Sequence, residues 1–140
     1  MRAGMLLGRA KRIVFVFGNR LEESDSIAPM VADRLRGKFS GIEFREADEP
    51  ADLPAAKSRE TWILDAAEGI RKVTLIEGTE SLLAAGAPVS LHDFDLQFEL
   101  RLLGKIGRLG RLKIIAIPRG YNIQKAAAEA GAILAKAAAL

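Results

Sequence analysis

The chain has 140 residues, 49% hydrophobic and 28% charged, which suits one soluble globular domain with one core. It contains no cysteine, which excludes disulfides, thiolate metal sites and a cysteine nucleophile, and its formal net charge of +3 is too small to indicate nucleic-acid binding. No apolar run reaches the roughly 18 residues that a membrane helix needs. We therefore expect one cytoplasmic domain over 1–140, with no membrane span and with residues 1–10 flexible.

The first half of the chain contains three predicted strands and one helix. Residues 13–17, IVFVF, are continuously apolar, as in a strand that is buried on both faces. Apolar residues at helical spacing then predict a helix that starts after an acidic loop and ends before Gly37. Residues 42–46 are predicted as a second strand, and residues 61–65, TWILD, as a third strand that ends at Asp65.

The fourth strand, predicted at residues 72–77, follows the third after a short connection. Only residues 66–71 separate the two strands, whereas a parallel crossover needs about a dozen residues or more. The fourth strand is therefore expected to run antiparallel to the third. A last strand is predicted at residues 112–117, and Asn122 is placed to cap a final alanine-rich helix.

Residues 94–102 carry two conflicting signals. Their strict alternation of apolar and polar residues fits a strand. However, Ser90 and Asp93 match a capping box with Ser90 as N-cap, and Phe98 and Leu102 lie four residues apart, as on one helix face. We predict a helix. The element order then predicts a three-layer α/β sandwich, a mixed and mostly parallel sheet of about five strands with helices on both faces.

Three groups that can bind a metal ion follow or end predicted elements of this sheet. Asp25, with Glu22 and Glu23 before it, follows the first strand, Asp65 ends the third, and His92 is the only histidine. Ligands of open α/β sheets collect beyond the carboxyl ends of the strands. Two carboxylates and one imidazole form an incomplete ligand set that suits a transition ion such as nickel or zinc. A helix N-terminus would keep His92 neutral, as a ligand must be.

Each of these residues also has a simpler interpretation. Asp25 is well placed to cap the first helix or to interact favourably with the positive end of its dipole, and spacing alone favours that role. A lone histidine is more often solvated or hydrogen-bonded than a ligand. Ser26 with His92 and an aspartate lacks a nucleophile elbow, so no catalytic residue is assigned.

The second half of the chain also contains a basic cluster with few aromatic residues. This composition is more typical of a solvated helix end than of a nucleic-acid surface, and it leaves an interaction patch for an acidic partner as the alternative. The cluster comprises Arg101, Lys105, Arg108, Arg111 and Lys113.

Five short motifs occur in an order and spacing that resemble a known family. They are VFGNRLEESDSIAP, WILDAAEG, VTLIEG, SLHDFDL and IIAIP, and with the last helix they span roughly residues 11–138. In this order the chain resembles the nickel–iron hydrogenase maturation endopeptidases. The resemblance implies a cytoplasmic, aspartic-type endopeptidase-like hydrolase that removes the C-terminal extension of a hydrogenase large-subunit precursor after nickel insertion.

The resemblance also implies which residues meet the metal. It places the three ligands at Asp25, Asp65 and His92, around nickel that the precursor carries, with zinc or cadmium as surrogate ions. The ion would position the scissile bond or polarise a carbonyl.

The same loop is expected to contact the substrate through Asn19, Glu22 and Glu23. The chain departs from the family pattern nearby, at Ser24, Ser26 and Ala28, where the family has an acid and two glycines. The three predicted ligands are retained and the two glycines are not, so these departures affect the predicted substrate contact more than the predicted metal site.

Two other functions fit parts of the pattern. A phospho-receiver domain has acids after its first strand and an aspartate at the end of its third, where this chain has Asp65. Against it, Gly18 and Asn19 intervene after the first strand, and Ile117 stands where a receiver has lysine. The other alternative is a non-catalytic relative that acts as a binding protein for a large subunit or another acidic partner.

Overall fold

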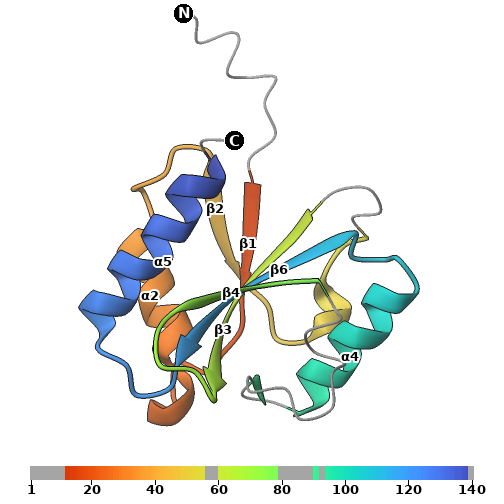
Figure 1. Ribbon diagram of the computed structural model, residues 1–140, viewed down its shortest axis with the longest axis horizontal. Coiled ribbons are helices and arrows are strands. Elements are labelled where there is room, and N and C mark those ends of the chain that lie inside the picture. The colour runs from red at the N-terminus through yellow and green to blue at the C-terminus, as the bar shows by residue number, and fades with distance from the viewer. Residues whose placement is uncertain (1–11, 56–59, 79–89, 92–93, 139–140) are drawn as a thin grey trace, which may run out of the picture.

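The computed structural model describes residues 12–55, 60–78, 90–91 and 94–138. A central sheet lies between two helical layers (Figure 1). Helices α2 (Ile27–Leu35) and α5 (Ile123–Ala138) lie against each other on one face of the sheet, and α4 (Phe94–Lys105) covers the other face. This arrangement confirms the predicted three-layer α/β sandwich. None of the described helices is long and apolar enough to cross a membrane.

The sheet has the strand order β2-β1-β3-β6-β4. Strands β1, β2, β3 and β6 run parallel, and β4 pairs with β6 in the antiparallel direction. The predicted reversal of the fourth strand is confirmed, with β6 as its neighbour. A phospho-receiver sheet is doubly wound and parallel, so the antiparallel edge strand does not support that alternative. The strand bounds are β1 Arg12–Val16, β2 Ile42–Glu46, β3 Glu60–Glu68, β4 Thr74–Glu77 and β6 Arg111–Pro118.

Strand β3 does not end at Asp65, and this part of the prediction was wrong. The strand continues to Glu68 because its ladder with β6 runs on until Ala67 pairs with Pro118. A two-residue strand, β5 (Ser90–Leu91), also pairs with this extension in the antiparallel direction. Asp65 therefore lies inside the sheet rather than at its edge.

The two conflicting signals around residue 94 are resolved in favour of the helix, which begins at Phe94. The predicted N-cap was wrong, because Ser90 belongs to β5 and pairs with Glu68. The cap of the last helix is confirmed, since the Asn122 Oδ1 atom accepts a hydrogen bond from the Lys125 N–H at 2.9 Å. Two single-turn 3-10 helices complete the described elements, η1 (Glu23–Asp25) and η2 (Pro50–Asp52).

The core has two parts, one on each side of the sheet. Along β3, Leu64 and Ala66 pack toward α2 and α5, while Ile63 and Ala67 belong to the core on the α4 side. Side chains of a strand alternate between the two faces. Asp65 therefore shares the face that α4 covers.

Candidate functional site

The loop between β1 and α2 closes tightly at Gly18. This glycine has a φ of +140°, and a Cβ atom there would lie 2.7 Å from the Asp25 carbonyl oxygen and 2.9 Å from the Pro29 Cδ atom. Only glycine fits both the backbone angle and the space. Gly18, two residues beyond the end of β1, therefore lets the acidic loop fold back onto the start of α2.

Asp25, the last residue of η1, is held against this turn. The Asn19 N–H donates to the Asp25 carbonyl oxygen at 2.8 Å and to its Oδ2 atom at 3.1 Å. The side chain of Asn19 stabilises the same turn, since its Oδ1 atom accepts a hydrogen bond from the Leu21 N–H at 2.9 Å. Asp25 is only 9% exposed. The loop thus fixes the position of one predicted metal ligand through backbone donors.

Asp65 is fully buried, with 0% exposure, in the middle of β3. Its Oδ1 atom accepts a hydrogen bond from the N–H of Ala66 at 2.9 Å. Carboxylates are almost never fully buried unless they are paired, hydrogen-bonded or bound to a metal, because removing the charge from water is costly. Hydrophobic packing therefore does not explain why a carboxylate occupies this buried position, which makes Asp65 a candidate functional residue.

The fold brings these two acids close to the carboxyl end of β1, since Asp25 lies in the loop beyond it and Asp65 follows Leu64, which pairs with the last residue of β1, Val16. The Phe17 N–H, just beyond β1, donates to the carbonyl oxygen of Leu64 at 3.0 Å. Asp65 directly follows Leu64, and Asp25 is hydrogen-bonded to Asn19, two residues beyond Phe17. Both acids lie toward the carboxyl ends of parallel strands, where α/β sheets place their ligands.

The third predicted ligand, His92, lies outside the described residues. The residue before it, Leu91, pairs with Ala67 of β3, two positions after Asp65. Within the described ranges, no group of three or more histidine, cysteine, aspartate and glutamate side chains is placed to hold a metal ion. The set of Asp25, Asp65 and His92 therefore stays a prediction, of which the structure describes the two acids.

The predicted substrate contacts and the departures from the family pattern lie on the same loop. Asn19, Glu22 and Glu23 are exposed, so their side chains are accessible to a partner. Their contact with a substrate stays a prediction. Ser26 and Ala28, in contrast, are buried where the loop meets α2. Two of the three departures are therefore packed beneath the loop rather than displayed on it.

An ion-pair network anchors the loop and was not predicted. The Arg20 guanidinium donates to Asp33 of α2 at 2.6 and 2.8 Å and to Glu46 at the end of β2 at 2.8 Å, and Arg36 pairs with both acids. The hydrogen bond from Arg20 lowers the pKa of Asp33 to about 2, and the same guanidinium lowers the pKa of Glu46. These partners belong to three different elements, so no local sequence pattern indicates the network.

Comparisons with known proteins bear on the fold. No protein-family model matches the chain, and no curated protein matches it in sequence. A solved structure does match it, the NiFe hydrogenase maturation protease HycI from Thermococcus kodakarensis KOD1. The chain shares the fold of this protease. The match covers 94% of this chain and 95% of HycI with a TM-score of 0.57, at 19% sequence identity. The resemblance seen in the motifs is thus confirmed at the level of the fold.

Proposed function

We propose that the chain is a peptidase that removes the C-terminal extension from a hydrogenase large-subunit precursor after nickel has been inserted. The observation that carries this proposal is the likeness to HycI, a protease of hydrogenase maturation, over nearly the full length of both chains. Of the two acids that the family resemblance assigns as ligands, Asp25 lies in the loop that follows β1, and Asp65 is fully buried on the neighbouring strand β3.

In this proposal the nickel ion arrives with the precursor and is part of the substrate. Asp25, Asp65 and His92 supply only some of its ligands, so positions remain for the groups of the precursor that already hold it. Backbone N–H groups of Asn19 and Ala66 hold the two carboxylates in place. Such supporting hydrogen bonds orient metal ligands and raise affinity. Binding the ion would fix the scissile peptide bond relative to the site.

The exposed loop residues would then contact the polypeptide around the metal. Asn19, Glu22 and Glu23 lie on the loop that also holds Asp25, and all three are exposed. Zinc or cadmium would serve as surrogate ions in binding experiments, because they accept the same oxygen and nitrogen ligands.

The direct test is to mix the chain with a nickel-loaded large-subunit precursor and to measure the precursor mass by mass spectrometry. Wild type is expected to shorten the precursor at its C-terminus, and Asp65→Asn and His92→Ala are expected not to. Glu60→Gln is a matched control, because Glu60 lies at the opposite end of the same strand and its bond from the Trp62 indole N–H is retained by glutamine. Binding of the precursor without cleavage would contradict the peptidase and favour the non-catalytic binding protein.

Nickel binding tests the ligand set separately. In calorimetry, Asp65→Asn and His92→Ala are each expected to weaken nickel binding by at least about tenfold, as loss of a ligand does. If both variants bind nickel as tightly as wild type, the site has been misplaced.

A further inference from the structure

The outer face of α4 carries a stripe of apolar side chains that the fold leaves in contact with solvent. Phe98, Leu102 and Ile106 are 51%, 49% and 62% exposed. Their spacing of four residues places them along one side of the helix and the turn that follows it. Leu96 and Leu100 of the same helix are buried in the core. Helix α4 is therefore apolar on two sides, and the sheet covers only one of them.

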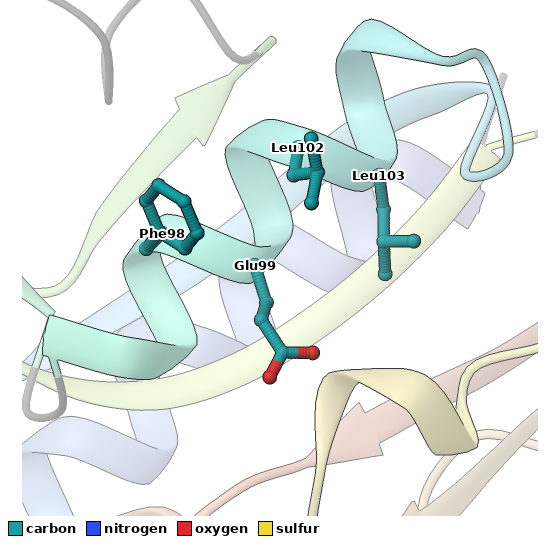
Figure 2. A pocket seen from close by; sticks show the side chains of 4 residues that line it. All are labelled: Phe98, Glu99, Leu102 and Leu103. Carbon is teal, nitrogen blue, oxygen red and sulfur yellow. The ribbon is translucent and has the colours of Figure 1, made fainter.

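The stripe borders a shallow groove on the surface. Phe98, Glu99, Leu102 and Leu103 line this groove, which has a volume of about 370 Å³. Figure 2 shows Phe98 and Leu102 on one side of the helix, with Glu99 and Leu103 pointing to the other side. A ridge of apolar side chains beside a groove is the surface that accepts the apolar side of another helix.

Positive charge concentrates around the same stripe. Residues 98–111 contain four basic residues and one acid, Glu99, so this segment carries the whole formal net charge of +3 and the rest of the chain is neutral in sum. Lys105, Arg108 and Arg111 are exposed, and none of them makes an ion pair with another residue in the described part of the chain. The Arg101 guanidinium lies 6.0 Å from the centroid of the Phe98 ring, so a basic side chain lies next to the apolar stripe.

We infer that this α4 face, made of Phe98, Leu102, Ile106 and the basic residues around them, binds an amphipathic helix of another protein whose apolar side is flanked by acidic side chains. The apolar residues would enter the groove, and the acids would pair with the exposed cations. The inference does not depend on the proposed peptidase activity.

Two other occupants fit the surface less well. A second copy of the chain would bring the same cations face to face, and like charges oppose each other across an interface. A bilayer surface would meet Glu99 inside the groove, which repels anionic headgroups. Among the described residues of this face it would also meet only three exposed apolar side chains, a small area to insert.

Designed peptides give the first test with the full chain. The probe is a fluorescent helical peptide of about 18 residues with leucine on one side and glutamate at the flanking positions. Its partner replaces each glutamate by lysine. The glutamate peptide is expected to bind at least about tenfold more tightly in fluorescence anisotropy and to weaken as salt is added. Equal binding of the two peptides, or none, would overturn the inference.

Variants then locate the binding to the α4 face. One double variant removes apolar side chains, Leu102→Gln with Ile106→Gln, and a second reverses charges, Lys105→Glu with Arg108→Glu. Each is expected to weaken binding of the glutamate peptide by about tenfold or more. Arg34→Glu with Lys38→Glu makes the same change of charge at exposed positions in and after α2 and is expected to change binding much less.

Three outcomes would contradict the inference. The first is undiminished binding by both α4 variants. The second is binding to phosphatidylserine vesicles without binding to the peptide, which would identify a lipid surface. The third is a dimer in sedimentation that Leu102→Gln dissociates, which would identify a second copy of the chain as the occupant.

Discussion

The two helical layers on either side of the sheet cover their apolar side chains to different extents. Helices α2 and α5 pack against each other as well as against the sheet. Among the described residues of that layer, Met30, at 44% exposure, is the large apolar side chain left in solvent. In the opposite layer, α4 is the one α-helix among the described residues, and Phe98 and Leu102 are exposed on its outer face.

The difference follows from how many neighbours each helix has. A helix of the first layer has two apolar contacts, the sheet and the other helix, so a wide apolar face is covered within the fold. Helix α4 has the sheet and η2 beside it, and its second apolar side has no covering element in the described part of the chain. Packing therefore accounts for the first layer, whereas the second presents a surface that an external partner can cover.

The largest expected effect separates the two layers directly. Leu134 of α5 is fully buried in the core, so Leu134→Ala is expected to lower the free energy of unfolding by about 2–5 kcal/mol. Leu102→Ala removes the same atoms from an exposed site and is expected to cost less than about 1 kcal/mol. Urea denaturation measures both. Similar losses for the two variants would show that the α4 face is packed after all.

The second prediction concerns the loop that joins β1 to the first layer. Gly18→Ala introduces a Cβ atom 2.7 Å from the Asp25 carbonyl oxygen at a positive φ, which is expected to cost about 2–3 kcal/mol. Gly41→Ala is the control, because no atom lies within 4 Å of its added Cβ atom. Thermal denaturation compares the two, and an undisturbed Gly18 variant would contradict the tight closure of the loop.

The third and smallest effect concerns the Arg20 network. Asp33 has a pKa of about 2 in the folded protein because Arg20 donates hydrogen bonds to its carboxylate. Without this guanidinium, in Arg20→Gln, the pKa of Asp33 is expected to rise toward its ordinary value of 3.8. Carboxyl titration by NMR measures this value. Arg45→Gln is the control, because Arg45 pairs with Glu43 outside the network.

The same pKa values predict how stability depends on pH. Asp33 and Glu46 bind protons less readily in the folded than in the unfolded protein, so their contribution is complete above about pH 5 and is lost as the pH falls toward 2. Wild type is therefore expected to lose more stability than Arg20→Gln between pH 4 and 2. Parallel pH profiles of the two proteins would contradict this role of Arg20.

Periodicity predicted the elements well where one local signal dominated. Four of the five residues of the run IVFVF lie in β1, and the helix from Phe94 was found because four-residue spacing outweighed the alternation. The N-cap at Ser90 failed because pairing with β3 drew this residue into β5. Asp65 was expected at the end of a strand, and pairing with β6 and β5 placed it in the interior.

The candidate site was predictable only in part for the same reason. Asp25 and Asp65 were selected as polar residues that follow or end apolar strands, and the fold places both near the carboxyl end of β1, with Asp65 inside the sheet. The close approach at Gly18 and the network of Arg20 depend on atoms from α2 and β2, which no local pattern encodes.

The sequence by itself determined the types of the longer helices and strands, the reversal of β4 and the residue types available for chemistry, because each depends on local spacing and connection length. Only the tertiary structure decided the strand order, the complete burial of Asp65 and the exposure of the second apolar side of α4. These features arise from contacts between segments far apart in the chain. Local periodicity shows that a side chain is apolar, and the surrounding packing decides whether anything covers it.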